Sequence, residues 1–193
     1  GAMYRAIALA AIKNDLLIDF SLSKEALIKM LPEIQIDIEH QENQENQVFL
    51  NEENVTSQLR NMKVSNLVSE VAAIPEVRDK LVKIQRQISR AKDVVMDGRD
   101  IGTVVFPYAD LKLFVKADAR IRAERRWMEM REKGDDIDFE DVFSNIKQRD
   151  IKDTTRKIAP LKKADDAIEL DNTHLNKKQQ LEQAIQLVNN LKH

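Results

Sequence analysis

The sequence predicts an α/β fold with a buried parallel strand, a small antiparallel insert and many helices. Residues 94–96 (Val-Val-Met) form a short run rich in β-branched side chains, which is typical of a strand buried on both faces of a parallel sheet. Residues 33–38 (EIQIDI) alternate polar and apolar side chains, as in a strand with one solvated face. Apolar residues at helical spacing fill most of the remaining segments, so sheet and helix are both expected.

Two helices are expected before the insert. Residues 1–14 are alanine-rich and place their apolar side chains at helical spacing. Ser23 can cap a second helix over residues 21–31, and Pro32 marks its end.

The insert is predicted to be an antiparallel pair of strands. Residues 48–50 (VFL) resume the extended pattern after residues 39–47, which are polar and low in complexity and therefore suit an exposed connection. His40 falls in this connection, and no chemistry is assigned to it.

Residues 55–92 return to a helical pattern. Thr56 can cap a short helix, and Pro75 suits the first turn of a later one. Between them, four apolar residues can share one helix face: Val64, Leu67, Val68 and Val71.

The carboxyl-terminal part is predicted to add two strands and three helices. The strands are residues 111–115 and 167–170, and the helices are residues 117–133, 138–155 and 176–192. Asp118 suits the start of the first of these helices and Gly134 its end. The last helix is amphipathic and is expected to pack on the sheet through Leu181, Ile185, Leu187 and Val188.

Composition restricts the classes of function. The 193 residues carry a formal net charge of −2, so a protein that binds polyanions over its whole surface is not expected. Cysteine is absent, which excludes disulfides and thiolate metal sites. The sequence shows neither a membrane-spanning apolar stretch nor the pattern of a secretory signal, and a cytoplasmic location is expected.

A cation and two carboxylates follow the predicted strand. Asp97 ends it, Gly98 allows a turn, and Arg99 and Asp100 emerge at the carboxyl edge, where open α/β sheets hold their ligands. The alternative is a β-turn whose charges only cap and solvate it.

Arginines recur at helical spacing elsewhere. Arg5 lies in the first turn of a helix, where free backbone N–H groups favour an anion, although an exposed arginine without function also fits. Two consecutive arginine-bearing helices look like a mobile lid, or else like solvent faces with i,i+4 ion pairs. Their residues are Arg122, Arg125, Arg126, Arg149, Asp150 and Asp153, with Arg156 just beyond.

Many arginines and few general bases suit phosphoryl transfer, which needs positioning and neutralisation of charge more than covalent help from the protein. The sequence has no cysteine nucleophile, G-x-S-x-G, H-E-x-x-H or G-x-G-x-x-G pattern.

Five segments, in order, resemble the bacterial cytidylate kinases, a family of P-loop nucleoside monophosphate kinases. They are GAMYRA, VSNLVSEVAAIPEVRDKL, VVMDGRDIGTVVFP, RAERRWMEMREKG and IKQRDIKDTTRKIAPL. The resemblance implies a parallel-sheet core with helices on both faces, formed by residues 1–32 and 93–193. It also implies a helical lid at about 118–157 and a nucleotide-binding insert with flanking helices at 33–92. The implied reaction converts CMP or dCMP and ATP to the diphosphate and ADP with Mg²⁺, and a monomer that binds neither nucleic acid nor membrane is expected.

The resemblance also assigns roles to individual residues. Tyr4 and Arg5 match the start of the acceptor-site helix, with Arg5 on the CMP phosphate, and Ser69, Arg78 and Asp100 match the cytosine contacts. Arg99 and Arg156 match phosphate contacts, and Arg149 and Asp153 match contacts to the sugar side and the lid. Asp97 suits the water shell of Mg²⁺, and Arg122, Arg125 and Arg126 match lid cations that approach ATP.

The sequence departs from the family in one large respect. The family begins with a strand, the loop G-x-x-x-x-G-K-[ST] and a helix, and that loop is absent from these 193 residues. The natural gene product is therefore predicted to continue upstream of Gly1, and this chain alone is expected not to turn over ATP. The alternative is a non-catalytic CMP-binding or scaffold protein that retains the acceptor half-site.

Overall fold

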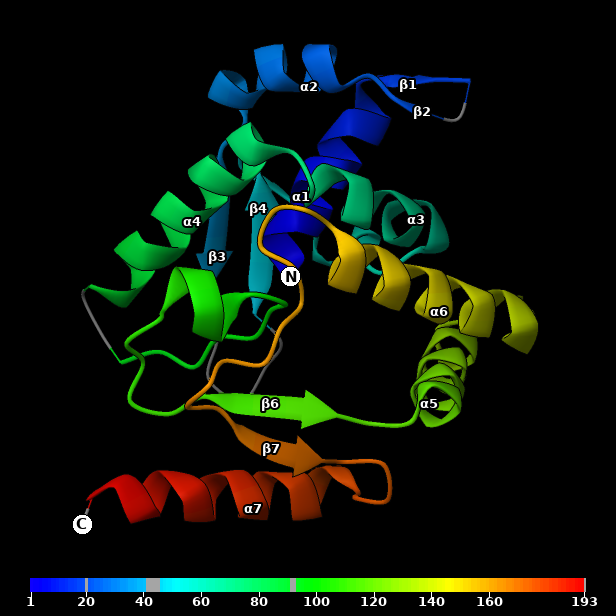
Figure 1. Ribbon diagram of the computed structural model, residues 1–193. Helices are drawn as coiled ribbons and strands as arrows, with labels where there is room; N and C mark the ends of the chain where they lie inside the picture. Colours follow the sequence, from blue (N-terminus) through cyan, green and yellow to red (C-terminus); the bar gives the residue numbers. More distant parts are fainter. Residues whose placement is uncertain (20, 41–45, 91–92, 193) are drawn as a thin grey trace. The chain divides into compact units, whose positions relative to one another are not determined.

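The computed structural model describes residues 1–19, 21–40, 46–90 and 93–192 (Figure 1). The chain forms two compact units. The first comprises residues 1–98 with 156–158, and the second comprises residues 99–155 with 159–193. No helix in the described ranges is long and apolar enough to cross a membrane.

Helix α1 (Ala2–Lys13) is the centre of the first unit. Its Ala6, Ile7, Ala8 and Ala11 are fully buried, and small side chains let neighbouring elements approach closely. Helix α3 (Met62–Val71) and strand β4 (Gln47–Leu50) pack against it. The first predicted helix is confirmed.

The apolar face predicted for α3 is confirmed. Val64, Leu67, Val68 and Val71 are all buried, and the side chain of Asn61 caps the helix by accepting the N–H of Val64 at 2.9 Å. Helix α4 (Pro75–Ser89) begins with proline in its first turn, as predicted.

The antiparallel insert is confirmed as a sheet of β3 (Ile36–Glu39), β4 and β5 (Glu53–Asn54). Ile36 pairs with Leu50 and Ile38 with Val48. Strand β3 begins later than residue 33 because η1 (Leu31–Glu33) continues the preceding helix. Residues 41–45 of the predicted connection lie outside the described residues. His40 Nδ1 and Asn46 Oδ1 are hydrogen-bonded at 2.8 Å.

Two predicted helix starts are corrected. Strands β1 (Leu17–Ile18) and β2 (Ser21–Leu22) form a hairpin, so α2 (Lys24–Met30) begins three residues later than predicted; Ser23 takes the N-cap position without a side-chain bond. Thr56 is the first residue of η2 (Thr56–Gln58) and not its cap. Its hydroxyl instead accepts the N–H of Val48 at 2.9 Å, which ties this turn to β4.

The second unit contains a parallel pair of strands, β6 (Leu113–Lys116) and β7 (Ile168–Asp171). Helices α5 (Ala119–Glu132) and α6 (Phe139–Thr155) follow β6 and pack as a hairpin around buried Ala123, Met130, Val142 and Ile146. Asp118 caps α5, and Gly134 ends the turn after it with φ +87. Both predicted strands and both helices are confirmed.

Helix α7 (Lys177–Asn189) and the short η4 (Asn190–Lys192) close the chain behind a capping box at Asn176. The predicted packing of α7 on a sheet is wrong for three of its four residues. Leu181, Ile185 and Val188 are 60%, 49% and 44% exposed. A sheet of two strands offers too little surface to cover them, and its own Val115 is 49% exposed.

The prediction of a buried strand at residues 94–97 is also wrong. In the part of the chain that the structure describes, these residues pair with no strand, and Val95 is fully exposed. A β-branched run becomes a strand only when a neighbour accepts its backbone hydrogen bonds. The parallel sheet that does form consists of β6 and β7.

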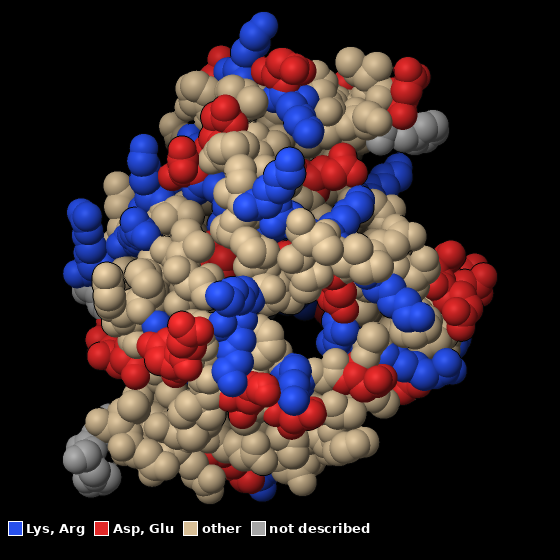
Figure 2. All heavy atoms as spheres, in the orientation of Figure 1, with Lys and Arg blue, Asp and Glu red and all other residues tan. Residues whose placement is uncertain are grey.

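Basic and acidic side chains are interspersed over the face drawn in Figure 2. In the second unit, an ion pair of this kind lies at the start of the parallel sheet, where Lys112 Nζ is 2.7 Å from Asp166 Oδ2. The hydrogen bond that Lys112 donates to Asp166 is the main reason why the pKa of the Asp166 carboxyl is below its ordinary value of 3.8.

The lowered pKa of Asp166 predicts a defined dependence on pH. A carboxyl whose pKa is depressed on folding contributes stability above its unfolded pKa, and this is lost as pH falls through the folded value. In Lys112→Met, we expect the pKa of Asp166 to rise, which an NMR titration of its carboxyl carbon measures. The lowered pKa of Asp171, which depends chiefly on Thr173, should stay unchanged, and an unaltered Asp166 would contradict the assignment.

Candidate functional site

In the first unit, three helices bring predicted site residues together. Arg5 lies in the first turns of α1, and its Nη1 donates to Ser65 Oγ at 3.0 Å and to the Leu59 carbonyl at 3.1 Å. The guanidinium carbon of Arg78, on α4, lies 5.7 Å from the centroid of the Tyr4 ring, a cation–π contact. Arg78 Nη1 also donates to the Ala72 carbonyl at 3.2 Å.

Most of these polar residues are buried. Arg78 is only 4% exposed and Ser69 6%, while Ser65, one turn before Ser69 on α3, is fully buried. Burying a guanidinium is costly unless oxygens or aromatic faces surround it. The fold supplies Arg78 with both, the Ala72 carbonyl and the Tyr4 ring, which offset the cost of burying its charge.

Two further predicted residues belong to the first unit. Asp97 is exposed and lies at the amino end of α1, where its Oδ2 would be 3.9 Å from a Cβ added at Gly1. Arg156, which directly follows α6 in the sequence, is half-buried.

In the second unit, Arg99 and Asp100 precede a π-helical turn, η3 (Ile101–Val105). The carbonyl of Asp100 accepts the N–H groups of Thr103, Val104 and Val105 at 2.9 to 3.3 Å. Asp100 is 5% exposed. The turn therefore fixes the backbone from which the Asp100 carboxyl projects.

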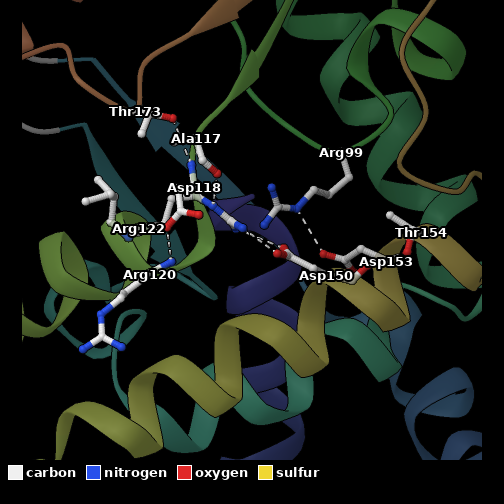
Figure 3. A network of polar contacts seen from close by, with 10 residues as sticks. Arg99, Ala117, Asp118, Arg120, Arg122, Asp150, Asp153, Thr154 and Thr173 are labelled. Atoms are coloured by element: carbon white, nitrogen blue, oxygen red, sulfur yellow. Dashed lines mark hydrogen bonds and ion pairs between the residues drawn. The ribbon is translucent and has the colours of Figure 1, made fainter.

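Helix α6 supplies the partner of Arg99. Arg99 Nε donates to Asp153 Oδ2 at 3.0 Å (Figure 3). The Asp153 side chain is 5% exposed, whereas that of Arg99 is 44% exposed. The buried carboxylate thus anchors a guanidinium that remains open to solvent, as a ligand-binding arginine requires.

Arg149 lies one turn before Asp153 on α6, and its surroundings disfavour its positive charge. Burial is the first cause that lowers its pKa, and the charges of Arg99 and Arg126 lower it further, partly opposed by Asp153 and Asp150. Its Nε is buried without a hydrogen-bond partner in the described ranges. An anion among these guanidinium groups would relieve both penalties.

The three predicted lid arginines of α5 have different environments. Arg122 binds both carboxylate oxygens of Asp150, at 3.1 and 2.7 Å (Figure 3), and the Ala117 carbonyl at 3.0 Å. Arg125 donates to Asn172 Oδ1 at 2.6 Å and to three carbonyls of residues 172–175. Arg126 is the member whose charge acts on Arg149.

Of the two interpretations of the arginine-bearing helices, the one with exposed i,i+4 ion pairs is confirmed in part, and the mobile lid remains a prediction. Exposed i,i+4 ion pairs do occur on α5, as between Lys133 and Glu129 at 3.1 Å. Two arginines of α5 instead interact with residues of α6, Arg122 with Asp150 and Arg126 with Arg149. Sequence reasoning missed Ser65 and Asp166, because their partners Arg5 and Lys112 are 60 and 54 residues away in the chain.

No group of three histidine, cysteine, aspartate or glutamate side chains suited to hold a metal ion occurs among the described residues.

Comparison with known proteins identifies relatives along nearly the whole chain. The model of the family described as "Cytidylate kinase" matches residues 1–190. A cytidylate kinase of Flavobacterium johnsoniae is 48% identical over 192 residues, which cover 99% of this chain and 84% of the relative. Cytidylate kinases of Phocaeicola vulgatus and Streptococcus pneumoniae are 47% and 46% identical, each over 91% of this chain and 77% and 78% of the relative.

The Arg122–Asp150 pair predicts the stability of the α5–α6 hairpin. Arg122→Ala leaves a partly buried carboxylate without its bidentate partner, and we expect unfolding to become easier by about 1–2 kcal/mol. Arg122→Lys should lose less stability than Arg122→Ala, because its ammonium still pairs with Asp150. It should not match the arginine, because an ammonium cannot bind both carboxylate oxygens as the planar guanidinium does.

Urea unfolding followed through Trp127 on α5 measures this difference. Lys133→Ala, which breaks an exposed i,i+4 pair on the same helix, is the matched control and should cost less than about 0.5 kcal/mol. Equal losses in Arg122→Ala and Lys133→Ala would contradict a structural role for the Arg122–Asp150 pair.

Proposed function

The chain belongs to the cytidylate kinase family, and on that premise we propose that it phosphorylates CMP or dCMP, with ATP as donor and Mg²⁺ as the metal. The family consists of nucleoside monophosphate kinases, so the chain is grouped with transferases. The acceptor nucleotide, the donor and the metal are the proposal.

The observation that carries the proposal is the charge on Arg149. The pKa of Arg149 is lowered by burial and by the charges of Arg99 and Arg126. Asp153 holds Arg99 through a hydrogen bond to its Nε. Phosphoryl transfer needs such an arrangement, because positioned cations must neutralise charge that spreads over phosphate oxygens. In this proposal, Arg99 and Arg149 serve the nucleotide phosphates and sugar, and Asp153 orients them.

Recognition of cytosine is assigned to buried polar groups. In the first unit, Arg78 donates to the ring acceptors, and the Ser69 hydroxyl assists it; both residues are more than nine-tenths buried. In the second unit, Asp100 accepts from the exocyclic amine, which uracil lacks. A site built to bond that amine rejects uracil, because the buried carboxylate would lose its partner.

The remaining residues complete the proposal. Arg5 and Arg156 bind the CMP phosphate, and Tyr4 supports Arg78 through the cation–π contact. Asp97 holds the water shell of Mg²⁺. The lid cations that approach ATP in this proposal are Arg122, Arg125 and Arg126.

A second candidate is a protein that binds CMP without phosphorylating it. Such a protein would need the acceptor site alone, without the loop G-x-x-x-x-G-K-[ST] that holds the phosphates of ATP in the family. Both candidates require the acceptor site, and they differ in turnover alone. Formation of CDP from CMP, ATP and Mg²⁺ supports the kinase, whereas CMP binding without CDP fits both candidates, because these 193 residues alone are expected not to turn over ATP.

Calorimetric titration with CMP, and with UMP as control, tests the acceptor site directly. We expect the chain to bind CMP more tightly than UMP by on the order of tenfold or more, and Asp100→Ala to lose this preference. Asp110→Ala removes an exposed carboxylate nearby in the sequence and should keep it. A folded chain without affinity for CMP, or an Asp100→Ala variant with the same preference, would overturn the assignment.

A further inference from the structure

Lys112 is a buried cation that the proposed reaction does not use. It lies at the start of β6, and its carbonyl accepts the Ile168 N–H at 2.9 Å, which aligns β6 with β7. Its side chain is 7% exposed. The ammonium donates to the Pro107 carbonyl at 2.5 Å and to the two Asp166 oxygens at 2.9 and 2.7 Å.

The aliphatic part of Lys112 lies against the π-helical turn. A Cβ added at Gly102 would come within 3.3 Å of Lys112 Cδ and 3.5 Å of its Cγ. Because Gly102 has no side chain, the turn can pack directly against the aliphatic part of Lys112. Lys112 thus packs near the start of the turn, at Gly102, and its hydrogen bond to the Pro107 carbonyl lies just after the end of the turn.

The same turn sets the place of Arg99 and Asp100. The Asp100 carbonyl accepts three N–H groups from the turn, and the Phe106 N–H bonds to the Ile101 carbonyl at 2.7 Å. A shift of η3 therefore moves the backbone of Asp100, and with it the carboxyl assigned to cytosine. Arg99, the preceding residue, would shift relative to its anchor Asp153.

We propose that Lys112 is a positioning residue, which, braced by Asp166, holds the 101–105 turn so that the Asp100 carboxyl and the Arg99 guanidinium keep their places. The hold on the turn stands by itself, whereas its consequence for nucleotide selection rests on the proposed function. A bidentate bond from a buried ammonium provides such a brace, because hydrogen bonds to charged groups are the stronger ones.

Amide hydrogen exchange tests the hold on the turn without any ligand. In Lys112→Met, which keeps the aliphatic stem, we expect protection of the Val104 and Val105 N–H groups to fall by about tenfold. Gly102→Ala should lower the same protection, because its Cβ meets the lysine stem. Lys116→Met removes an exposed lysine of the same strand, paired with Glu169 at 3.6 Å, and should change neither N–H.

Calorimetry with CMP and UMP tests the consequence. We expect Lys112→Met to reduce the ratio of the two affinities by about threefold to tenfold, and Lys112→Arg to restore most of it. A loss of general stability would lower the folded fraction without changing this ratio. Lys116→Met again serves as the control.

The outcomes separate the two proposals. Unchanged protection in both Lys112→Met and Gly102→Ala would overturn the positioning role, and if Lys112→Met fails to fold, Gly102→Ala decides. The role in selection is overturned if Lys112→Met keeps the CMP-to-UMP ratio while Asp100→Ala loses it. If Asp100→Ala also keeps the ratio, the assignment of Asp100 to cytosine is wrong, and exchange alone decides on Lys112.

Discussion

The cost of burying positive charge is the constraint on which the candidate site depends. Arginine cannot lose its proton at physiological pH, so each buried guanidinium needs oxygens or an aromatic face around it. The fold supplies these partners from neighbouring and from distant segments: Ala72 and Tyr4 for Arg78, Ser65 and Leu59 for Arg5, and Asp150 for Arg122. The partners fix the direction of each side chain, and a set of flexible cations becomes an ordered one.

Arg149 departs from this pattern, and the departure carries chemical meaning. Its neighbours include Arg99 and Arg126, whose charges add to the effect of burial in lowering its pKa, and its Nε is buried without a protein acceptor among the described residues. In the proposed function, a bound phosphate would offset this penalty. The arginines thus differ in their surroundings: Arg122 and Arg125 donate to several protein oxygens, whereas Arg149 lies among the positive charges of Arg99 and Arg126.

The sequence predicted what depends on local chemistry. Apolar spacing, caps such as Asp118, and Pro75 in a first turn located the helices, and alternation located the strands of the insert. Predictions that depend on distant neighbours were wrong: residues 94–97 find no strand to pair with in the described ranges, and Leu181 finds no covering surface. The roles given to site residues came from resemblance of motifs, and they remain proposals.

The motif at residues 97–105 shows why resemblance of sequence and reasoning from residues complement each other. Its charged members are visible as candidates for chemistry, but the place of Gly102 becomes clear only from a lysine ten residues later, because a Cβ at Gly102 would lie within 3.3 Å of the stem of Lys112. Similarly, the Asp100 carbonyl matters as much as its carboxyl, because it gathers the N–H groups of the turn. A single motif can therefore combine residues proposed to contact a ligand with residues that hold them in place. The Lys112–Asp166 pair belongs to the second kind, and only the folded chain reveals it.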